Sequence, residues 1–120
     1  GGFANAGCLY PQDKVTVEGD TKSFCKDPSH PMPSHRTFCS KCGGHVMNSH
    51  PSKGLHDVCA GILKAFPFQP DVFVNYGDAT RPFPYKDGTP KFKDLPKKFG
   101  GSNILLDEVS GAEMGEAPEH

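Results

Sequence analysis

Short alternations of apolar and polar residues recur along the chain, without the longer spacing of an amphipathic helix. Residues 15–18 alternate valine with polar residues before Gly19, which predicts a short strand ended by a turn. Residues 23–25 are its expected hairpin partner. Residues 35–38 and 45–47 predict a second hairpin, with a turn rich in Cys and Gly between its strands. These periods favour a β fold over a helical one.

Two longer apolar runs follow this hairpin. Residues 55–63 predict a central strand, with alternate apolar residues on one face and Cys59 on the other. Residues 71–76 predict a further strand, and residues 104–106 a last short strand or helical turn. Because no helical segments separate these strands, we expect antiparallel sheets.

Proline-rich and polar stretches lie between the predicted strands. We expect exposed loops at residues 26–34 and 48–54, and an irregular arm at residues 81–99 whose aromatic rings cover a sheet face. The last stretch combines acidic and small residues without an aromatic one, which is typical of a solvated tail. The sequence therefore predicts an all-β, loop-rich domain of stacked antiparallel sheets over residues 1–106, followed by a flexible acidic tail at 107–120.

Charge and composition exclude several classes of protein. The 120 residues carry a formal charge of −1, which gives no basic stripe for nucleic acid. No apolar run approaches the roughly 18 residues of a membrane span, and the N-terminus lacks the pattern of a signal peptide. Five cysteines with one close pair suit a reducing compartment. We therefore expect a cytoplasmic protein that binds neither nucleic acid nor membrane.

The most specific chemical signal is Cys39-Ser-Lys-Cys42, followed directly by two glycines. Two thiolates at this spacing can face one metal ion if the backbone turns tightly, and Gly43 and Gly44 permit that turn. A structural zinc needs four ligands, so two more must come from elsewhere. A metal-free thiol pair is the alternative, and a thioredoxin-like redox pair is disfavoured because the glycines oppose a helix.

Other potential ligands are weaker candidates. His45 and His50 could complete a local set with Cys39 and Cys42, but His45 follows Cys42 too closely to favour this. The remaining thiols are spread along the chain and are expected to be small buried hydrophobes: Cys8, Cys25 and Cys59.

Four stretches in order, residues 35–44, 58–63, 68–74 and 87–92, resemble the glutathione-dependent formaldehyde-activating enzyme family, which also contains centromere protein V. The resemblance extends over about residues 1–96. It implies a β fold of stacked antiparallel sheets that binds zinc. It also implies carbon–sulfur lyase chemistry on thiol adducts such as S-hydroxymethylglutathione, with glutathione as co-substrate.

The chain also departs from that family. Members carry two further cysteine elements, one that joins the Cys39/Cys42-type pair around a structural zinc and one that holds a catalytic zinc. Residues 1–120 contain neither element, so the resemblance carries over only Cys39 and Cys42 as half of the structural site, and the catalytic residues are unknown.

Two hypotheses follow. The chain, which begins without Met, is either the C-terminal portion of a zinc-dependent lyase or a complete, non-catalytic β module. In the second case, Cys39 and Cys42 meet their copies in a two-fold homodimer.

Overall fold

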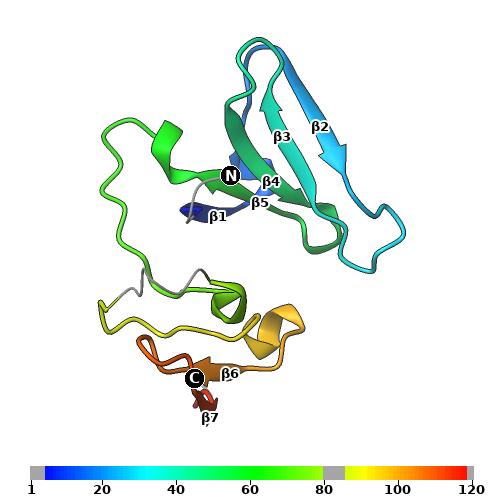
Figure 1. Ribbon diagram of the computed structural model, residues 1–120. Coiled ribbons are helices and arrows are strands. Elements are labelled where there is room, and N and C mark those ends of the chain that lie inside the picture. Colours follow the sequence, from blue (N-terminus) through cyan, green and yellow to red (C-terminus); the bar gives the residue numbers. More distant parts are fainter. Residues whose placement is uncertain (1–4, 80–85, 119–120) are drawn as a thin grey trace. The chain divides into compact units, whose positions relative to one another are not determined.

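The computed structural model describes residues 5–79 and 86–118 and divides the chain into two compact units, one within Ala4–Phe68 and one within Gln69–His120 (Figure 1). The regular elements of the described residues are β-strands in antiparallel sheets and 3₁₀ helices of three residues each. None of these helices has the length and apolar character needed to cross a membrane. The expected all-β fold with antiparallel sheets is confirmed, whereas the stacking of sheets and the zinc-binding type stay predictions.

The first unit is built on a five-stranded antiparallel sheet, with strands in the order β1-β5-β4-β3-β2 (Figure 1). Its strands are β1 (Gly7–Pro11), β2 (Thr21–Cys25), β3 (His35–Cys39), β4 (His45–His50) and β5 (Leu55–Cys59). The connection from β3 to β4 is short, as an antiparallel hairpin allows, whereas β1 pairs with β5 far along the sequence. Strand β4 therefore lies in the middle of the sheet.

A tight turn sets the register of β4 on β5. The helix η2 (Pro51–Lys53) begins with a proline, whose fixed φ suits a first helical position, and ends at Gly54 with φ of 65°. A residue with a Cβ would be strained at this left-handed φ. Glycine adopts it freely, and the chain can therefore reverse here. The Gly54 carbonyl also accepts a 2.9 Å hydrogen bond from the Gln12 N–H, which ties the end of β1 to this turn.

A cross-strand row of buried side chains forms the core of the first unit. Thr37 lies opposite Met47, and Met47 lies opposite Val58, so the three share one face of the sheet. Each is less than a tenth exposed. The Thr37 hydroxyl is satisfied by a 3.1 Å hydrogen bond with the Ser23 hydroxyl from the neighbouring strand. This row fixes the register of strands β3 to β5.

Strand β2 forms one edge of the sheet and is open to solvent. It pairs only with β3, and four of its five residues are exposed. Phe24 is 58% exposed in spite of its apolar ring. The outer backbone groups of this strand have no strand partner among the described residues.

The second unit combines short helices, isolated bridges and one small sheet. Backbone pairing joins Phe73 to Lys91 and Phe92 to Leu105, so three separate segments meet there. The regular elements are η4 (Tyr76–Asp78), η5 (Lys97–Phe99), β6 (Ile104–Leu106) and β7 (Glu113–Glu116). The buried apolar side chains are Tyr76, Phe92 and Leu106.

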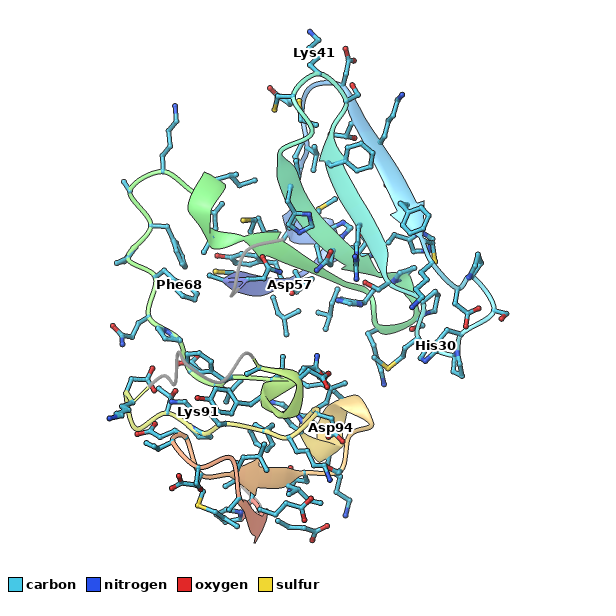
Figure 2. All side chains as sticks on the ribbon, in the orientation of Figure 1. His30, Lys41, Asp57, Phe68, Lys91 and Asp94 are labelled. Carbon is cyan, nitrogen blue, oxygen red and sulfur yellow. The ribbon has the colours of Figure 1, made fainter. Side chains whose placement is uncertain are left out.

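Lys91, labelled in Figure 2, is a buried cation of this unit, with 2% of its surface exposed. Its Nζ donates hydrogen bonds to the carboxylates of Asp87 and Glu108 and to the Thr89 hydroxyl, and it lies 4.5 Å from the centre of the Phe73 ring. Burial lowers the pKa of Lys91, but the two carboxylates outweigh it and the net direction is upward. The hydrogen bond from Lys91 is the main cause that lowers the pKa of Asp87 to about 2.

Two predicted strands are wrong. Residues 15–18 have no strand partner among the described residues, because they line an open hollow instead of pairing, and Val17 is 42% exposed. Residues 71–76 form only the single bridge at Phe73, since Asn75 takes φ of 53° and Tyr76 begins η4. A left-handed residue interrupts the extended backbone that a strand requires.

Other boundaries also differ from the prediction. The strand expected over residues 55–63 ends at Cys59, where η3 (Ala60–Ile62) turns the chain and leaves Ile62 49% exposed. The loop expected from residue 48 begins later, because β4 pairs with β5 as far as His50. Residues 80–85 of the expected irregular arm lie outside the described residues.

The segment predicted as a solvated tail contains strand β7. Glu113 and Glu116 pair with Leu106 and Ile104 of β6, and the intervening loop is held by backbone N–H bonds to the Asp107 carboxylate. The acidic composition of this segment predicted a solvated tail. In the structure, carboxylates of the hairpin loop instead accept local hydrogen bonds. Glu108, in the same loop, pairs with the buried Lys91.

We expect Lys91→Met to lower the free energy of unfolding by about 3 kcal/mol, because it removes a buried cation from two carboxylates. The low pKa of Asp87 contributes stability that is present above the unfolded carboxyl pKa and is lost as pH falls toward about 2. Without Lys91, this loss on acidification should be smaller. Urea unfolding followed by circular dichroism at several pH values measures both effects. Lys93→Met, which removes an exposed ion pair with Glu113, is the control and should have little effect. Equal stability of the two variants would contradict this role of Lys91.

Candidate metal-binding knuckle

The structure places Cys39 and Cys42 at the tip of the β3–β4 hairpin. Cys39 is the last residue of β3, Cys42 lies in the turn, and β4 begins at His45. Lys41, between the two cysteines, marks the tip of this hairpin in Figure 2. A hairpin tip holds both thiols at one end of the sheet and leaves them accessible, since Cys42 is exposed and Cys39 half-buried.

The backbone of the turn has a tight, hydrogen-bonded geometry. The Gly43 N–H donates to the Cys39 carbonyl at 2.8 Å, and the Cys39 N–H donates to the Gly44 carbonyl at 2.8 Å. Gly43 has φ of 76°, which a residue with a Cβ adopts only with strain. The two glycines that follow Cys42 in the sequence therefore have the local role that the motif predicts.

Backbone N–H groups also face the two sulfurs. The Gly44 N–H donates to Cys42 Sγ at 3.4 Å. Hydrogen bonds from the backbone of Cys42 and then of Lys41, with a further one from the Cys42 side chain, lower the pKa of Cys39. Burial and the nearby Asp20 carboxylate act in the opposite direction, but the net direction is downward. Because the thiolate is the form that binds metal, this turn is arranged to favour a ligand at Cys39.

The remaining cysteines lie on other parts of the sheet. Cys25 pairs with His35 at the opposite end of β2 and β3 from Cys39, while Cys8 and Cys59 lie on β1 and β5. All five thiols are free of disulfides. The prediction that Cys8, Cys25 and Cys59 are buried hydrophobes is only partly met, since each is half-buried.

The described residues do not complete a four-ligand site. Over residues 5–79 and 86–118, no group of three or more Cys, His, Asp or Glu side chains is placed to hold one metal ion. His45 and His50 begin and end β4, so the strand carries His50 away from the knuckle. The two further ligands that a zinc ion needs are thus not supplied by this local set.

A hollow of about 710 Å³ adjoins the knuckle on the first unit and includes Cys39 in its lining. Met47 and Val58 from the buried row contribute apolar surface to it, and the segments around residues 14–20 and 62–67 enclose it. The strand predicted at residues 15–18 did not indicate this hollow. Its lining includes the exposed apolar residues Val17, Ile62 and Phe66.

Comparison with known proteins adds no relative: no protein-family model, curated protein or solved structure matches the chain. The interpretation of the site therefore rests on its own geometry and on the motifs of the sequence.

We expect Gly43→Ala to lower the free energy of unfolding by about 1 kcal/mol, because alanine is strained at this left-handed φ. Gly61→Ala is a matched control, since a Cβ there would meet nothing closer than the Cys59 sulfur at 3.9 Å. Thermal unfolding of both variants measures the difference. Equal destabilisation by the two substitutions would contradict the special role of Gly43.

Proposed function

We propose that this chain is a zinc-binding protein whose Cys39–Cys42 knuckle holds a structural zinc ion. The observation that supports this most directly is the set of backbone N–H groups directed at the two sulfurs. A thiolate that accepts N–H hydrogen bonds carries its negative charge at lower cost, and zinc requires that charge. The cytoplasm, where thiols stay reduced, is the compartment that suits such a site.

A metal-free thiol pair is the simpler alternative, and it explains the geometry less well. A buried pair would gain from apolar packing, but Cys42 is exposed. A redox pair would be expected at the start of a helix, whereas these cysteines lie on a β-hairpin. Zinc makes use of both the exposure of the sulfurs and the N–H groups around them.

We further propose that the protein takes part in carbon–sulfur lyase chemistry on thiol adducts related to S-hydroxymethylglutathione. This substrate class rests on the resemblance of the sequence motifs to the formaldehyde-activating family. In that scheme Cys39 and Cys42 stabilise the fold and do not touch the substrate. A zinc ion at a separate catalytic site would stabilise the sulfur of the adduct as a thiolate.

A non-catalytic module that assembles as a homodimer is the second candidate. The hollow beside Cys39 favours it, because its lining combines apolar residues with Lys14 and Lys64 as well as Glu18 and Asp20. A surface that carries both charges can be complementary to a copy of itself across a two-fold axis. Two copies would then supply four thiolates to one zinc ion.

We expect Cys39→Ser and Cys42→Ser each to lose zinc and thermal stability together, because the binding free energy of a structural site contributes to folding. Cys25→Ser, at the far end of the same strand pair, should keep its zinc. Zinc content by elemental analysis, and the thiolate-to-metal absorption of the cobalt-substituted protein, measure the change. Full zinc content in both knuckle variants would place the ligands elsewhere.

Zinc stoichiometry and turnover separate the two candidates. The lyase predicts zinc-dependent formation or cleavage of the adduct of formaldehyde with glutathione. The module predicts about half an equivalent of zinc per chain, a dimeric mass in solution and no turnover. For the protein of native length, a monomer with zinc and turnover would rule out the module, whereas a zinc-bound dimer without turnover would rule out the lyase.

A further inference from the structure

Asp57 lies at the centre of β5, on the five-stranded sheet and away from the knuckle (Figure 2). It pairs with Leu9 of β1 on one side and with Asn48 of β4 on the other. Residues directly opposite each other on antiparallel strands share a face, so Asp57 and Asn48 project from the same side of the sheet. The carboxyl is thus set among three strands, but it stays half-buried and reachable.

The carboxyl is packed against the backbone of β1. A Cβ built on Gly7 would lie 2.0 Å from Asp57 Oδ1, so only glycine leaves room for the carboxyl in this position. Gly7 is opposite Cys59, two residues along β5 from Asp57. The contact withdraws the carboxyl from water on the β1 side.

None of the described residues donates a hydrogen bond to the Asp57 carboxyl. Within the described residues, neither a backbone group nor a side chain makes a hydrogen bond or ion pair with Asp57, and the buried Oδ1 of Asn48 opposite it also lacks a partner. Other carboxyls of the chain behave differently. Asp87, Asp94 and Asp107 all accept hydrogen bonds that lower their pKa.

The electrostatic surroundings of Asp57 set its proton affinity. Burial raises the pKa of Asp57, while His50 and then His45, both on β4, act to lower it, and the net direction is upward. On the β1 side, burial and then the charges of Asp57 and Cys59 raise the pKa of the Cys8 thiol. On the face of the sheet that carries Asp57, Asn48 is its neighbour on β4 and Arg36 lies beyond Asn48 on β3, whereas Cys8, opposite Val58, projects from the other face.

The surroundings of the Asp57 carboxylate do not stabilise the folded chain. A half-buried carboxylate without donors loses hydration and gains no hydrogen bond in return. The raised pKa of Asp57 leads to the same conclusion, because it means that the charged form at neutral pH is less favourable in the folded chain than in the unfolded one. These surroundings suit, however, an acid–base group, whose lone pairs must stay free for a substrate proton.

We propose that Asp57 is the general acid–base residue for the thiol-adduct chemistry, a role that rests on the lyase function proposed above. In cleavage, the Asp57 carboxylate takes the hydroxyl proton of an S-hydroxymethyl thiol. The oxygen electron pair forms the carbonyl of formaldehyde, the carbon–sulfur bond breaks, and its electron pair stays on sulfur as the thiolate. In the reverse direction, the thiolate adds to formaldehyde and protonated Asp57 gives its proton to the new hydroxyl.

The test is Asp57→Asn, which keeps the shape of the side chain and removes the proton exchange. We expect kcat for cleavage of S-hydroxymethylglutathione to fall at least about 100-fold, with unchanged zinc content and little change in KM. In the wild type, kcat should fall on acidification through a pKa above the ordinary carboxyl range, and this limb should be absent from the variant. The variant should also be at least as stable as the wild type at neutral pH. Asp27→Asn, in an exposed loop, is the control.

Gly7→Ala gives an independent variant, since its methyl group displaces the Asp57 carboxyl without removing any titratable group. We expect it to lower kcat while zinc content and fold are kept. As a readout other than activity, the NMR titration midpoint of the Asp57 carboxyl carbon should shift when the unreactive analogue S-methylglutathione is added.

Three outcomes are distinguishable. If Asp57→Asn retains kcat within about threefold of the wild type, or if the analogue leaves the Asp57 midpoint unchanged, the role of Asp57 is overturned and the lyase stands. If the zinc-loaded wild-type protein of native length has no turnover, the lyase function fails, and the role of Asp57 fails with it. Loss of the acid limb only in Asp57→Asn supports both.

Discussion

The reversal of the backbone between Cys39 and Gly44 is the constraint on which the first unit depends. It joins β3 to β4 and places Thr37 opposite Met47, which in turn lies opposite Val58 on β5. The same reversal directs N–H groups toward two sulfurs. Packing and chemistry are thus coupled through one turn, because a change in its backbone would shift the register of the sheet and the donors around the thiols together.

The two units differ in the groups that surround their buried or half-buried ionisable side chains. In the second unit, Lys91 is fully buried but has two carboxylates, a hydroxyl and an aromatic ring around it. In the first unit, Asp57 is only half-buried and has no donor among the described residues. A saturated cation stabilises a loop-rich fold, whereas an acid without a donor contributes no such stability. This contrast separates a structural ionisable group from one that is free to exchange a proton.

The sequence predicted the parts of the fold that local chemistry determines. The two strands around the knuckle and the Cys-x-x-Cys turn followed from alternation and from glycine, and residues 104–106, predicted as a strand or a helical turn, form β6. Strand β7 was missed because its pairing with β6 depends on a loop held by Asp107, which acidic composition alone does not reveal. The strand predicted at residues 15–18 failed for the opposite reason: its alternation had no partner.

Of the candidate functional residues, only those in a local sequence motif could be predicted. Cys39 and Cys42 form a recognisable motif, so their place at a hairpin tip could be expected. Asp57 could not, because its surroundings come from β1 and β4, and nothing near it in the sequence indicates that Gly7 will lie against its carboxyl. Long-range pairing of β1 with β5 creates that environment, and a single sequence carries little information on such pairing.

The open edge at β2 has a consequence for handling the protein. An edge strand with free backbone groups is a template on which another extended chain can add, and Lys22 is the only charged residue in Thr21–Cys25 to oppose this. The exposed ring of Phe24 adds apolar surface to this edge and further favours self-association. At high concentration, self-association should therefore begin at this strand, and a second lysine in place of Phe24 is the natural way to improve solubility.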